Sequence, residues 1–233
     1  MNQNNQQYKQ IFIVIRHGER QDFSDNEVKM HTCDPELTER GKRQANEAGV
    51  QIMNFLKNDL KLKKIKITVL SSPFSRTLTT AHHLSKGMNV NQEIYIENGI
   101  CEILSKSYFT DQPTTFLGLY TNEENFVKET KDYKLINKSY SEMPTFPESF
   151  SNCYDRNETA FKIFKENYAN KSKDDEVEII IMVTHGYSVQ ALTQCMEIDY
   201  EVYQVEFCET FIFGYNGNTY KLLKDQFNTE HIK

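Results

Sequence analysis

Two segments of the chain, residues 11–15 and 179–183, are apolar at every position. A strand with one face in water alternates apolar and polar residues, whereas a strand that is covered on both faces does not. Residues 65–70 form a third, largely apolar run, and segments with apolar residues at helical spacing lie between these runs. Alternation of covered strands and helices predicts a three-layer α/β fold, with a mostly parallel central sheet between helices.

The same pattern predicts the individual elements. Strands are expected at residues 10–15, 65–70, 93–97 and 177–184, and helices at 37–58, 74–86, 149–170 and 188–196. Residues 206–213 and 219–224 read as a terminal edge hairpin that turns at Asn216-Gly217. Thr38 is the expected N-cap of the first helix. Ser71-Ser72-Pro73 reads as a serine cap followed by a proline in the first turn of the second helix.

The domain organisation is expected to be simple. A polar tail, residues 1–9, precedes a single domain over residues 10–233. Residues 103–147 form an irregular stretch that is too long for an ordinary connection, so we expect them to form a cap or lid insertion.

Composition excludes several classes of function. Acidic residues outnumber basic ones, 33 to 27, which argues against a nucleic-acid-binding surface. The apolar runs are too short to span a membrane, and five cysteines without a C-x-x-C pair indicate reduced thiols in a cytoplasmic protein.

No ATP-binding loop motif occurs, and the adjacent His82 and His83 do not share a helix face as metal ligands would. We expect neither metal nor cofactor, while a homodimer or a larger assembly stays open.

Three predicted strands end in residues with unusual chemistry. The first leads into Arg16 and His17, with Arg20 close behind; the second leads to Arg76; the last leads to His185. The carboxyl ends of parallel strands meet at one edge of a sheet, so these side chains should converge. Cations without a counter-ion are costly to bury, and arginine forks fit phosphate oxygens, so the expected ligand is a doubly charged phosphate group.

Histidine in such a pocket points to covalent catalysis. Nearby arginines lower the pKa of His17, which keeps a ring nitrogen free to attack phosphorus and form a phosphohistidine. The arginines and His185 would stabilise the charge of the transferring phosphoryl group without a metal.

Five sequence motifs resemble those of the histidine phosphatase superfamily, which is also called phosphoglycerate mutase-like. They are RHG at 16–18, LTERGKRQA at 37–45, SSPFSRTLTTA at 71–81, ES at 148–149 and THG at 184–186, in the family order. The resemblance covers residues 11 to about 192. It implies that His17 is the phosphorylated nucleophile and that Arg16, Arg76 and His185 complete the phosphate pocket. The family's proton donor is a carboxylate after the third strand, for which Glu102 is the candidate, with Glu97 and Glu19 as weaker alternatives.

The motif RHGER at residues 16–20 resembles one branch of this superfamily in particular. With Arg20 as an extra phosphate ligand, it looks like the Sts/TULA-type branch, whose members include protein-tyrosine and steroid-phosphate phosphatases. The stretch ESFSNCYDR at 148–156 is also similar to that branch. Mutases carry a Ser or Thr shortly after RHG and an Asn further on, and this chain lacks both.

The sequence therefore favours a metal-independent phosphomonoester hydrolase that acts on phosphoprotein or on small phosphorylated metabolites. Phospho-His17 would be the intermediate, and Glu102 would protonate the leaving oxygen and then activate water. A phosphoglycerate mutase or sugar-bisphosphatase is one alternative. A retired phosphatase that serves as a structural or binding subunit is another, although the core residues His17, Arg16, Arg76 and His185 are all retained.

Overall fold

The computed structural model describes residues 8–24, 33–90, 93–110, 113, 134–136, 139–167, 176–196 and 204–225. These residues form a sheet with the strand order β4-β3-β2-β5-β1-β6-β7. The strands are β1 (Gln10–Arg16), β2 (Ile65–Ser71), β3 (Ile94–Ile96), β4 (Leu135–Ile136), β5 (Val177–Thr184), β6 (Thr210–Tyr215) and β7 (Tyr220–Asp225). Strands β1 to β5 pair in parallel, and the hairpin of β6 and β7 joins the edge of β1 in antiparallel fashion.

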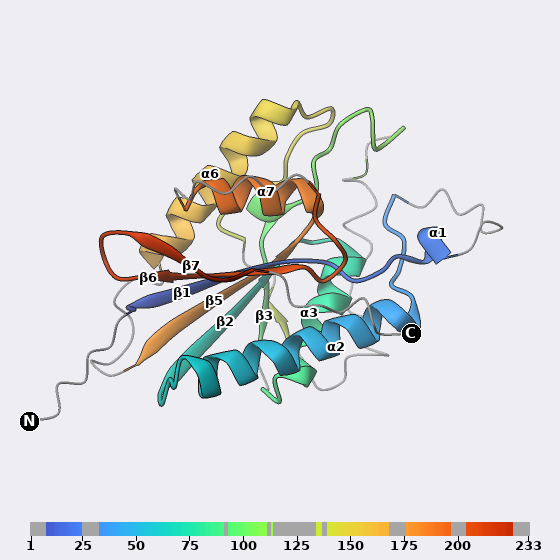
Figure 1. Cartoon of the computed structure of the whole chain (residues 1–233). Helices are drawn as coiled ribbons and strands as arrows, with labels where there is room; N and C mark the ends of the chain where they lie inside the picture. The colour runs from blue at the N-terminus through green and yellow to red at the C-terminus, as the bar shows by residue number, and fades with distance from the viewer. Residues whose placement is uncertain are drawn as a thin grey trace, which may run out of the picture.

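Helices cover both faces of this sheet, as Figure 1 shows. They are α1 (Gln21–Ser24), α2 (Glu39–Asn54), α3 (Ser75–Gly87), α6 (Phe150–Asn167) and α7 (Gly186–Gln194). A short π-helix at Phe55–Asp59 directly follows α2, and a 3-10 helix lies at Asn98–Ile100. In Figure 1, α2 and α3 lie below the sheet, and α6 and α7 lie above it. The predicted three-layer α/β fold is therefore confirmed.

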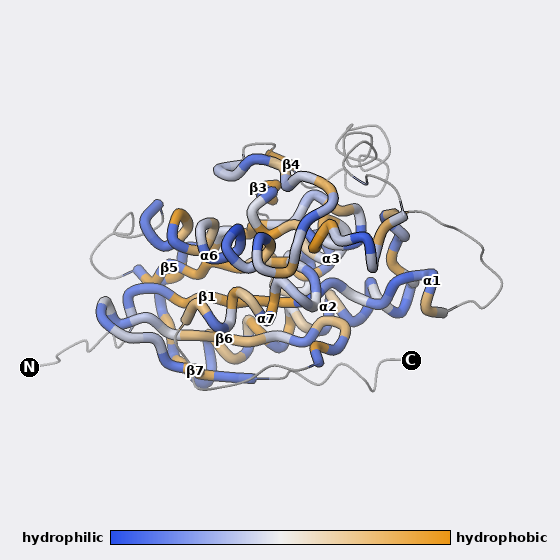
Figure 2. The backbone as a smooth tube through the Cα atoms, turned by 90° about the horizontal axis from the view of Figure 1, so that it is seen from above, coloured by the Kyte–Doolittle hydropathy of each residue, from blue (hydrophilic) through white to orange (hydrophobic). Residues whose placement is uncertain are grey.

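The first strand shows why these segments are apolar throughout. Ile11, Ile13 and Ile15 belong to the core cluster that includes the buried faces of α2 and α3. Phe12 and Val14 belong to the cluster that includes α6 and α7. All five side chains are fully buried. Figure 2 shows the resulting hydrophobic colour along β1 and β6. Both faces of the strand contribute to burial, which is the main stabilising term of such a fold.

The caps of the two helices beneath the sheet differ in how well the sequence predicted them. The Thr38 cap of α2 is confirmed, because its hydroxyl oxygen accepts the Gly41 amide at 2.9 Å. The serine cap of α3 was wrong: the N-cap is Phe74, and Pro73 lies before it. A carboxylate from another part of the chain does the capping instead, since Oδ2 of Asp34 accepts the Ser75 amide at 2.6 Å.

Other elements also depart from the sequence pattern. Helix α1 and the short strand β4 were not predicted, and the terminal hairpin begins only at Thr210. Phe150 is 47% exposed, so the expected aromatic stripe of α6 is not entirely core, and its last predicted member, Tyr168, lies outside the described residues. Most of the expected cap insertion and residues 1–7 of the tail also lie outside them. No helix in the described ranges is long and apolar enough to cross a membrane.

Candidate active site

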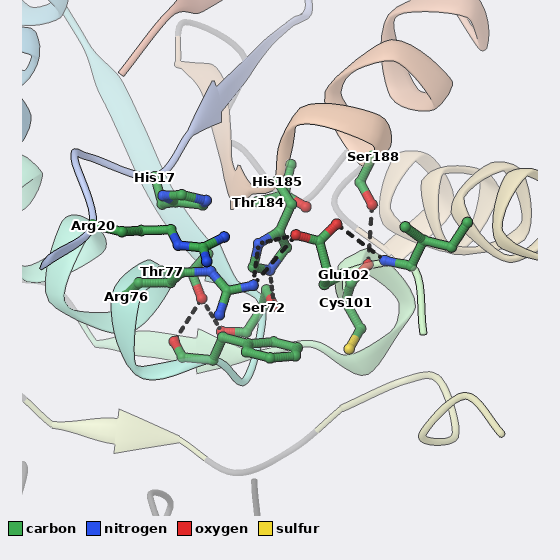
Figure 3. Close-up of polar contacts among 12 residues, drawn as sticks. His17, Arg20, Ser72, Arg76, Thr77, Cys101, Glu102, Thr184, His185 and Ser188 are labelled. Atoms are coloured by element: carbon green, nitrogen blue, oxygen red, sulfur yellow. Dashed lines mark hydrogen bonds and ion pairs between the residues drawn. The ribbon is translucent and has the colours of Figure 1, made fainter. Parts of the chain in front are cut away.

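The candidate site lies at the carboxyl ends of the three neighbouring strands β1, β5 and β2. Backbone hydrogen bonds continue past the ends of these strands: the His17 amide donates to Thr184 at 2.9 Å, and the Ser72 amide donates to Val183 at 3.0 Å. The rings of His17 and His185 are thereby brought edge to face, with centroids 5.3 Å apart. Figure 3 shows the guanidinium groups of Arg20 and Arg76 directed toward these two rings. The predicted convergence of the strand ends is present, whereas the catalytic role of each residue stays a prediction.

His17 is held in a defined orientation. Its side chain is buried, and its Nδ1 lies 2.8 Å from the carbonyl oxygen of Gly18. That carbonyl can only accept, so Nδ1 carries the hydrogen and Nε2 carries the lone pair. Burial lowers the pKa of His17 well below its usual range, and the charge of Arg76 lowers it further. The ring is therefore neutral at neutral pH and nucleophilic at Nε2.

The glycine after His17 is required by close packing of two backbones. A β-carbon on Gly18 would lie 2.5 Å from the carbonyl oxygen of Gly41 in α2. A β-carbon on Gly41 would in turn lie 2.4 Å from the carbonyl oxygen of Glu19. The Gly18 amide also donates to Oγ1 of Thr80 in α3 at 3.0 Å. Three sequence motifs that are far apart in the chain are thus joined directly behind His17.

Arg76 is the central cation of the site and is 1% exposed. Its Nη1 lies 3.1 Å from Oδ1 of Asp34, and its Nη2 lies 3.3 Å from Oε2 of Glu102 and 3.2 Å from Nδ1 of His185. The expectation that the cations lack a counter-ion was therefore wrong for Arg76. A charge this deeply buried must be paired, and the fold brings two carboxylates to it from distant parts of the sequence.

Arg16 and Arg20, the other two arginines of the site, make different contacts from those of Arg76. Arg16 donates from Nη1 to the carbonyl oxygen of Val205, and its guanidinium lies 4.3 Å from the ring centroid of Phe207. No described residue accepts a hydrogen bond from the buried Nε of Arg16 or from that of Arg76. Arg20 is more exposed and forms a two-point ion pair with Asp22, so this cation too has an internal counter-ion.

The three acid candidates occupy distinct environments. Glu102 lies at the site, with Oε2 3.2 Å from Nδ1 of His185. Glu97 is buried in a turn, where its carboxylate accepts the amides of Gly99, Tyr140 and Ser141. Glu19 binds the hydroxyl of Thr38 and pairs with Arg40. Only Glu102, of these three, contacts a strand-end residue of the predicted pocket through its carboxylate.

His185 connects the two sides of the site. It is fully buried as the N-cap residue of α7, and its Nε2 lies 2.8 Å from Oγ of Ser72. Burial lowers the pKa of His185 to about 4, against the opposing effect of Glu102 and with a further contribution from Arg76. The imidazole is therefore neutral at neutral pH, and its ring packs edge-on against Phe74 at 5.1 Å.

Four residues at or near the site were not predicted as functional from the sequence: Asp34, Ser72, Phe207 and Arg156. Ser72 was expected only as a cap, and its place directly after a strand that leads to Arg76 was the available signal. Asp34 and Phe207 lie outside the regular strands and helices, so no periodicity marks them. Arg156 stood in the quoted stretch ESFSNCYDR, but its contacts depend on a turn that is distant in sequence. In the described residues, no group of three or more metal-ligating side chains was found.

Comparison with known proteins identifies the family. The sequence pattern of the histidine phosphatase superfamily, branch 1, matches residues 12–224. No curated protein sequence matched the chain.

Solved structures with a similar fold include an ecdysone phosphate phosphatase from Bombyx mori in complex with tungstate, at 16% identity and a TM-score of 0.68, covering 94% of this chain and 95% of the other. A phosphoserine phosphatase from Entamoeba histolytica in complex with 3-phosphoglyceric acid has 21% identity and a TM-score of 0.56, covering 94% and 98%. A mycobacterial glucosyl-3-phosphoglycerate phosphatase in complex with VO3 has 15% identity and a TM-score of 0.56, covering 91% and 96%. The fold, together with the pattern match over most of the chain, establishes that this protein belongs to branch 1 of the histidine phosphatase superfamily.

Proposed function

We propose that the protein is a phosphomonoester hydrolase that works through a phosphohistidine on His17. The observation that carries this proposal is the state of the imidazole. Its Nδ1 is bound to the Gly18 carbonyl, its Nε2 is unprotonated, and the buried Arg76 lies close enough to lower its pKa. A neutral nucleophile beside fixed cations suits attack on a phosphate dianion.

The first half of the reaction transfers the phosphoryl group to the protein. The lone pair of His17 Nε2 attacks phosphorus while the bond from phosphorus to the leaving oxygen breaks. Arg16, Arg20, Arg76 and His185 surround the phosphoryl oxygens, and Glu102 donates a proton to the leaving oxygen. The products of this step are phospho-His17, the free alcohol and ionised Glu102.

The second half restores the free protein. Ionised Glu102 takes a proton from water, and the resulting hydroxide attacks phosphorus. The bond between Nε2 and phosphorus breaks, its electron pair returns to His17, and phosphate leaves. Glu102 is then protonated again for the next cycle.

Protonated Glu102 requires the bound substrate. In the free protein, burial raises the pKa of Glu102, but His185, Arg76 and the Ile103 amide outweigh burial and lower it to about 2. A phosphate dianion beside Arg76 neutralises part of this cationic environment and repels a second negative charge. Substrate binding therefore raises the pKa of Glu102 toward the range in which it donates a proton, and the substrate monoanion can bring that proton into the pocket.

Residues around His17 support a proposal on the branch of the superfamily and on the substrate class. We place the chain near the Sts/TULA-type branch, on the strength of RHGER and of the fold shared with an ecdysone phosphate phosphatase. The ring of Phe207 lies 5.8 Å from that of His17, and Phe23, which is 65% exposed, packs edge-on against Phe207. This apolar surface beside the nucleophile suits an organic group larger than that of phosphoglycerate. The substrate would be a phosphoprotein or a small phosphorylated metabolite.

Two other functions make different predictions. A mutase or sugar-bisphosphatase would be stimulated by a bisphosphate primer and would prefer small phosphosugars or phosphoglycerate. A non-enzymatic subunit would turn over no phosphoester and would co-purify with stable partners. The burial of His17, Arg76 and His185 favours an enzyme over a non-enzymatic subunit, because burying polar side chains costs stability. A substrate panel with and without primer separates the hydrolase from the mutase.

The direct test compares His17→Ala with His83→Ala, a histidine on the neighbouring helix α3. With p-nitrophenyl phosphate as substrate, we expect His17→Ala to lose roughly 10³-fold or more of kcat/KM and His83→Ala to retain activity. Rapid quenching under alkaline conditions followed by mass spectrometry should locate phosphate on His17. Phosphate trapped on another residue, or undiminished turnover by His17→Ala, would overturn the proposal.

A further inference from the structure

The turn that carries Glu102 is held by its own carbonyl groups. Four consecutive carbonyl oxygens, those of residues 99–102, accept hydrogen bonds from side chains of three other elements. Thr184 at the end of β5 donates to residue 100 at 2.6 Å, and Ser188 of α7 donates to residue 101 at 3.0 Å. Figure 3 shows Ser188, Cys101 and Glu102 on this side of the site. We call residues 98–104 the acid turn.

Arg156 of α6 supplies the remaining anchors. Its Nη1 donates to the carbonyl oxygens of Gly99 at 2.9 Å and Cys101 at 3.2 Å, and its Nη2 donates to that of Glu102 at 3.4 Å. An arginine fork can reach several carbonyls at once, whereas a lysine presents a single point charge. One side chain therefore fixes three carbonyls of the acid turn, including that of Glu102 itself.

Glu148 fixes both Arg156 and the far end of the acid turn. Its two carboxylate oxygens accept from Nε and Nη2 of Arg156 at 2.8 and 2.9 Å. Oε2 also accepts the Leu104 amide at 3.2 Å, and the Glu148 amide donates to the Leu104 carbonyl at 2.8 Å. The side chains of this ion pair are only 11% and 5% exposed. Such buried pairs are strong when their remaining hydrogen-bonding groups are satisfied, as they are here.

The carboxylate of Glu102 depends on this framework for its position. Its Oε1 accepts the amide of Ile103, within the same turn, at 3.1 Å. Its Oε2 reaches His185 and Arg76 at 3.2 and 3.3 Å, which is near the limit of a charged hydrogen bond. A small displacement of the turn would therefore remove the carboxylate from the site.

We propose that Arg156 and Glu148 are positioning residues that set the location of Glu102 for proton transfer. This inference rests on the proposed function, because it needs Glu102 to act on the leaving group. Among the described contacts, neither residue touches the side chains of Arg16, His17 or Arg76. Their loss should impair protonation of the leaving oxygen while phosphate binding is preserved.

A structural role alone predicts something different. If the pair merely stabilised the packing of α6, its loss would lower the free energy of unfolding and reduce activity to the same extent for every substrate. A positioning role depends on the leaving group. A good leaving group such as 2,4-dinitrophenolate departs without a proton, whereas phenolate needs one.

The experiment measures kcat/KM for 2,4-dinitrophenyl phosphate and for phenyl phosphate in Arg156→Lys, Glu148→Gln and Glu102→Gln. The matched control is Glu178→Gln, which changes another buried acid, ion-paired to Lys66 in the sheet at 3.0 Å. We expect Arg156→Lys and Glu148→Gln to lose about tenfold to 10²-fold on phenyl phosphate, with KM nearly unchanged, and less than about threefold on the dinitrophenyl ester. Glu178→Gln should show melting-temperature loss without any dependence on the leaving group.

The outcomes separate the two proposals. If Glu102→Gln shows a leaving-group dependence and the Arg156 and Glu148 variants lose both substrates equally, or lose neither, the positioning role is refuted. If Glu102→Gln itself lacks that dependence, the proposed role of Glu102 fails first. Ser188→Ala removes one neutral anchor of the acid turn and decides the question if the charged variants do not fold. If Ser188→Ala loses more kcat/KM on phenyl phosphate than on the dinitrophenyl ester, the inference is supported, even where the loss is smaller than for the charged variants. An equal loss on both esters refutes it.

Discussion

His17 and Glu102 lie on either side of His185, but different parts of the structure hold them in position. His17 directly follows a fully buried strand, and the parallel ladder of β1 and β5 continues into its own amide. Glu102 lies in an irregular turn after a three-residue strand, and side chains from α6, α7 and the end of β5 hold that turn. The backbone of a sheet fixes one side of the site, and side-chain hydrogen bonds fix the other.

This difference teaches where the site is sensitive to substitution. Positions on the strand-end side depend on core packing, so single changes outside the motifs should act mainly by lowering the free energy of unfolding. The acid side depends on a few charged and polar groups, so one substitution can move the carboxylate. Arg76 touches both sides, because it pairs with Asp34 next to its own helix and with Glu102 across the pocket.

Arg76→Ala should have the largest effect, because it breaks both sides at once. Two buried carboxylates lose their shared partner, and removing one partner of a buried pair costs about 3–5 kcal/mol. Urea unfolding should show this loss together with loss of phosphatase activity. The matched variant Arg40→Ala removes a half-exposed partner of Glu19 and should cost less than about 1 kcal/mol. Equal losses in the two variants would contradict the view that Arg76 links the two sides.

Acidification should lower the stability of the protein through His17 and His185, by less than Arg76→Ala and by more than Ser72→Ala. The folded pKa of His185 is lowered to about 4 by burial, and that of His17 is lowered in the same direction. Both rings become protonated near pH 6.5 in the unfolded chain, so the unfolded state binds more protons below that pH. Stability is therefore complete above pH 6.5 and falls as the pH drops toward 4, by up to about 3 kcal/mol for His185.

Melting temperatures between pH 7.5 and pH 4.5 measure this effect. The double variant His17→Asn/His185→Asn should show a flatter profile than the wild type, whatever its absolute stability. A wild-type profile that is flat in this range, or a double variant that is equally steep, would show that the two rings are not buried in neutral form.

Ser72→Ala should have the smallest effect. It tests whether two adjacent serines at the end of β2 differ in their importance for the site. It removes the hydroxyl at 2.8 Å from His185 Nε2, which should cost about 1 kcal/mol and reduce kcat/KM a few-fold. Ser71→Ala is the control, because that buried hydroxyl donates to the Ser72 carbonyl and not to the histidine. Equal kinetic effects of the two variants would remove any specific role for Ser72.

The sequence predicted the strand-end side better than the acid side, for physical reasons. Continuous apolar runs indicate covered parallel strands, and parallel strands place Arg16, His17 and His185 at one edge without further information. Asp34 could not be found in this way, because no periodicity connects it to Arg76 across 42 positions. Glu102 was preferred to Glu97 because Glu97 ends the predicted strand, but only the fold shows the partners of the two carboxylates, the Gly99 amide for Glu97 and His185 for Glu102.

The anchoring of the acid turn also bears on how such a chain can diversify. Residues 105–147 leave this turn and return at Glu148, whose backbone and side chain are both bonded to Leu104. That contact closes a stem at the base of the excursion, and residues 139–141 within the excursion bond to Glu97 and Asn98. A change in the number of residues between 114 and 133 would leave all of these contacts intact. Insertions or deletions in that part of the chain are therefore compatible with the observed position of Glu102.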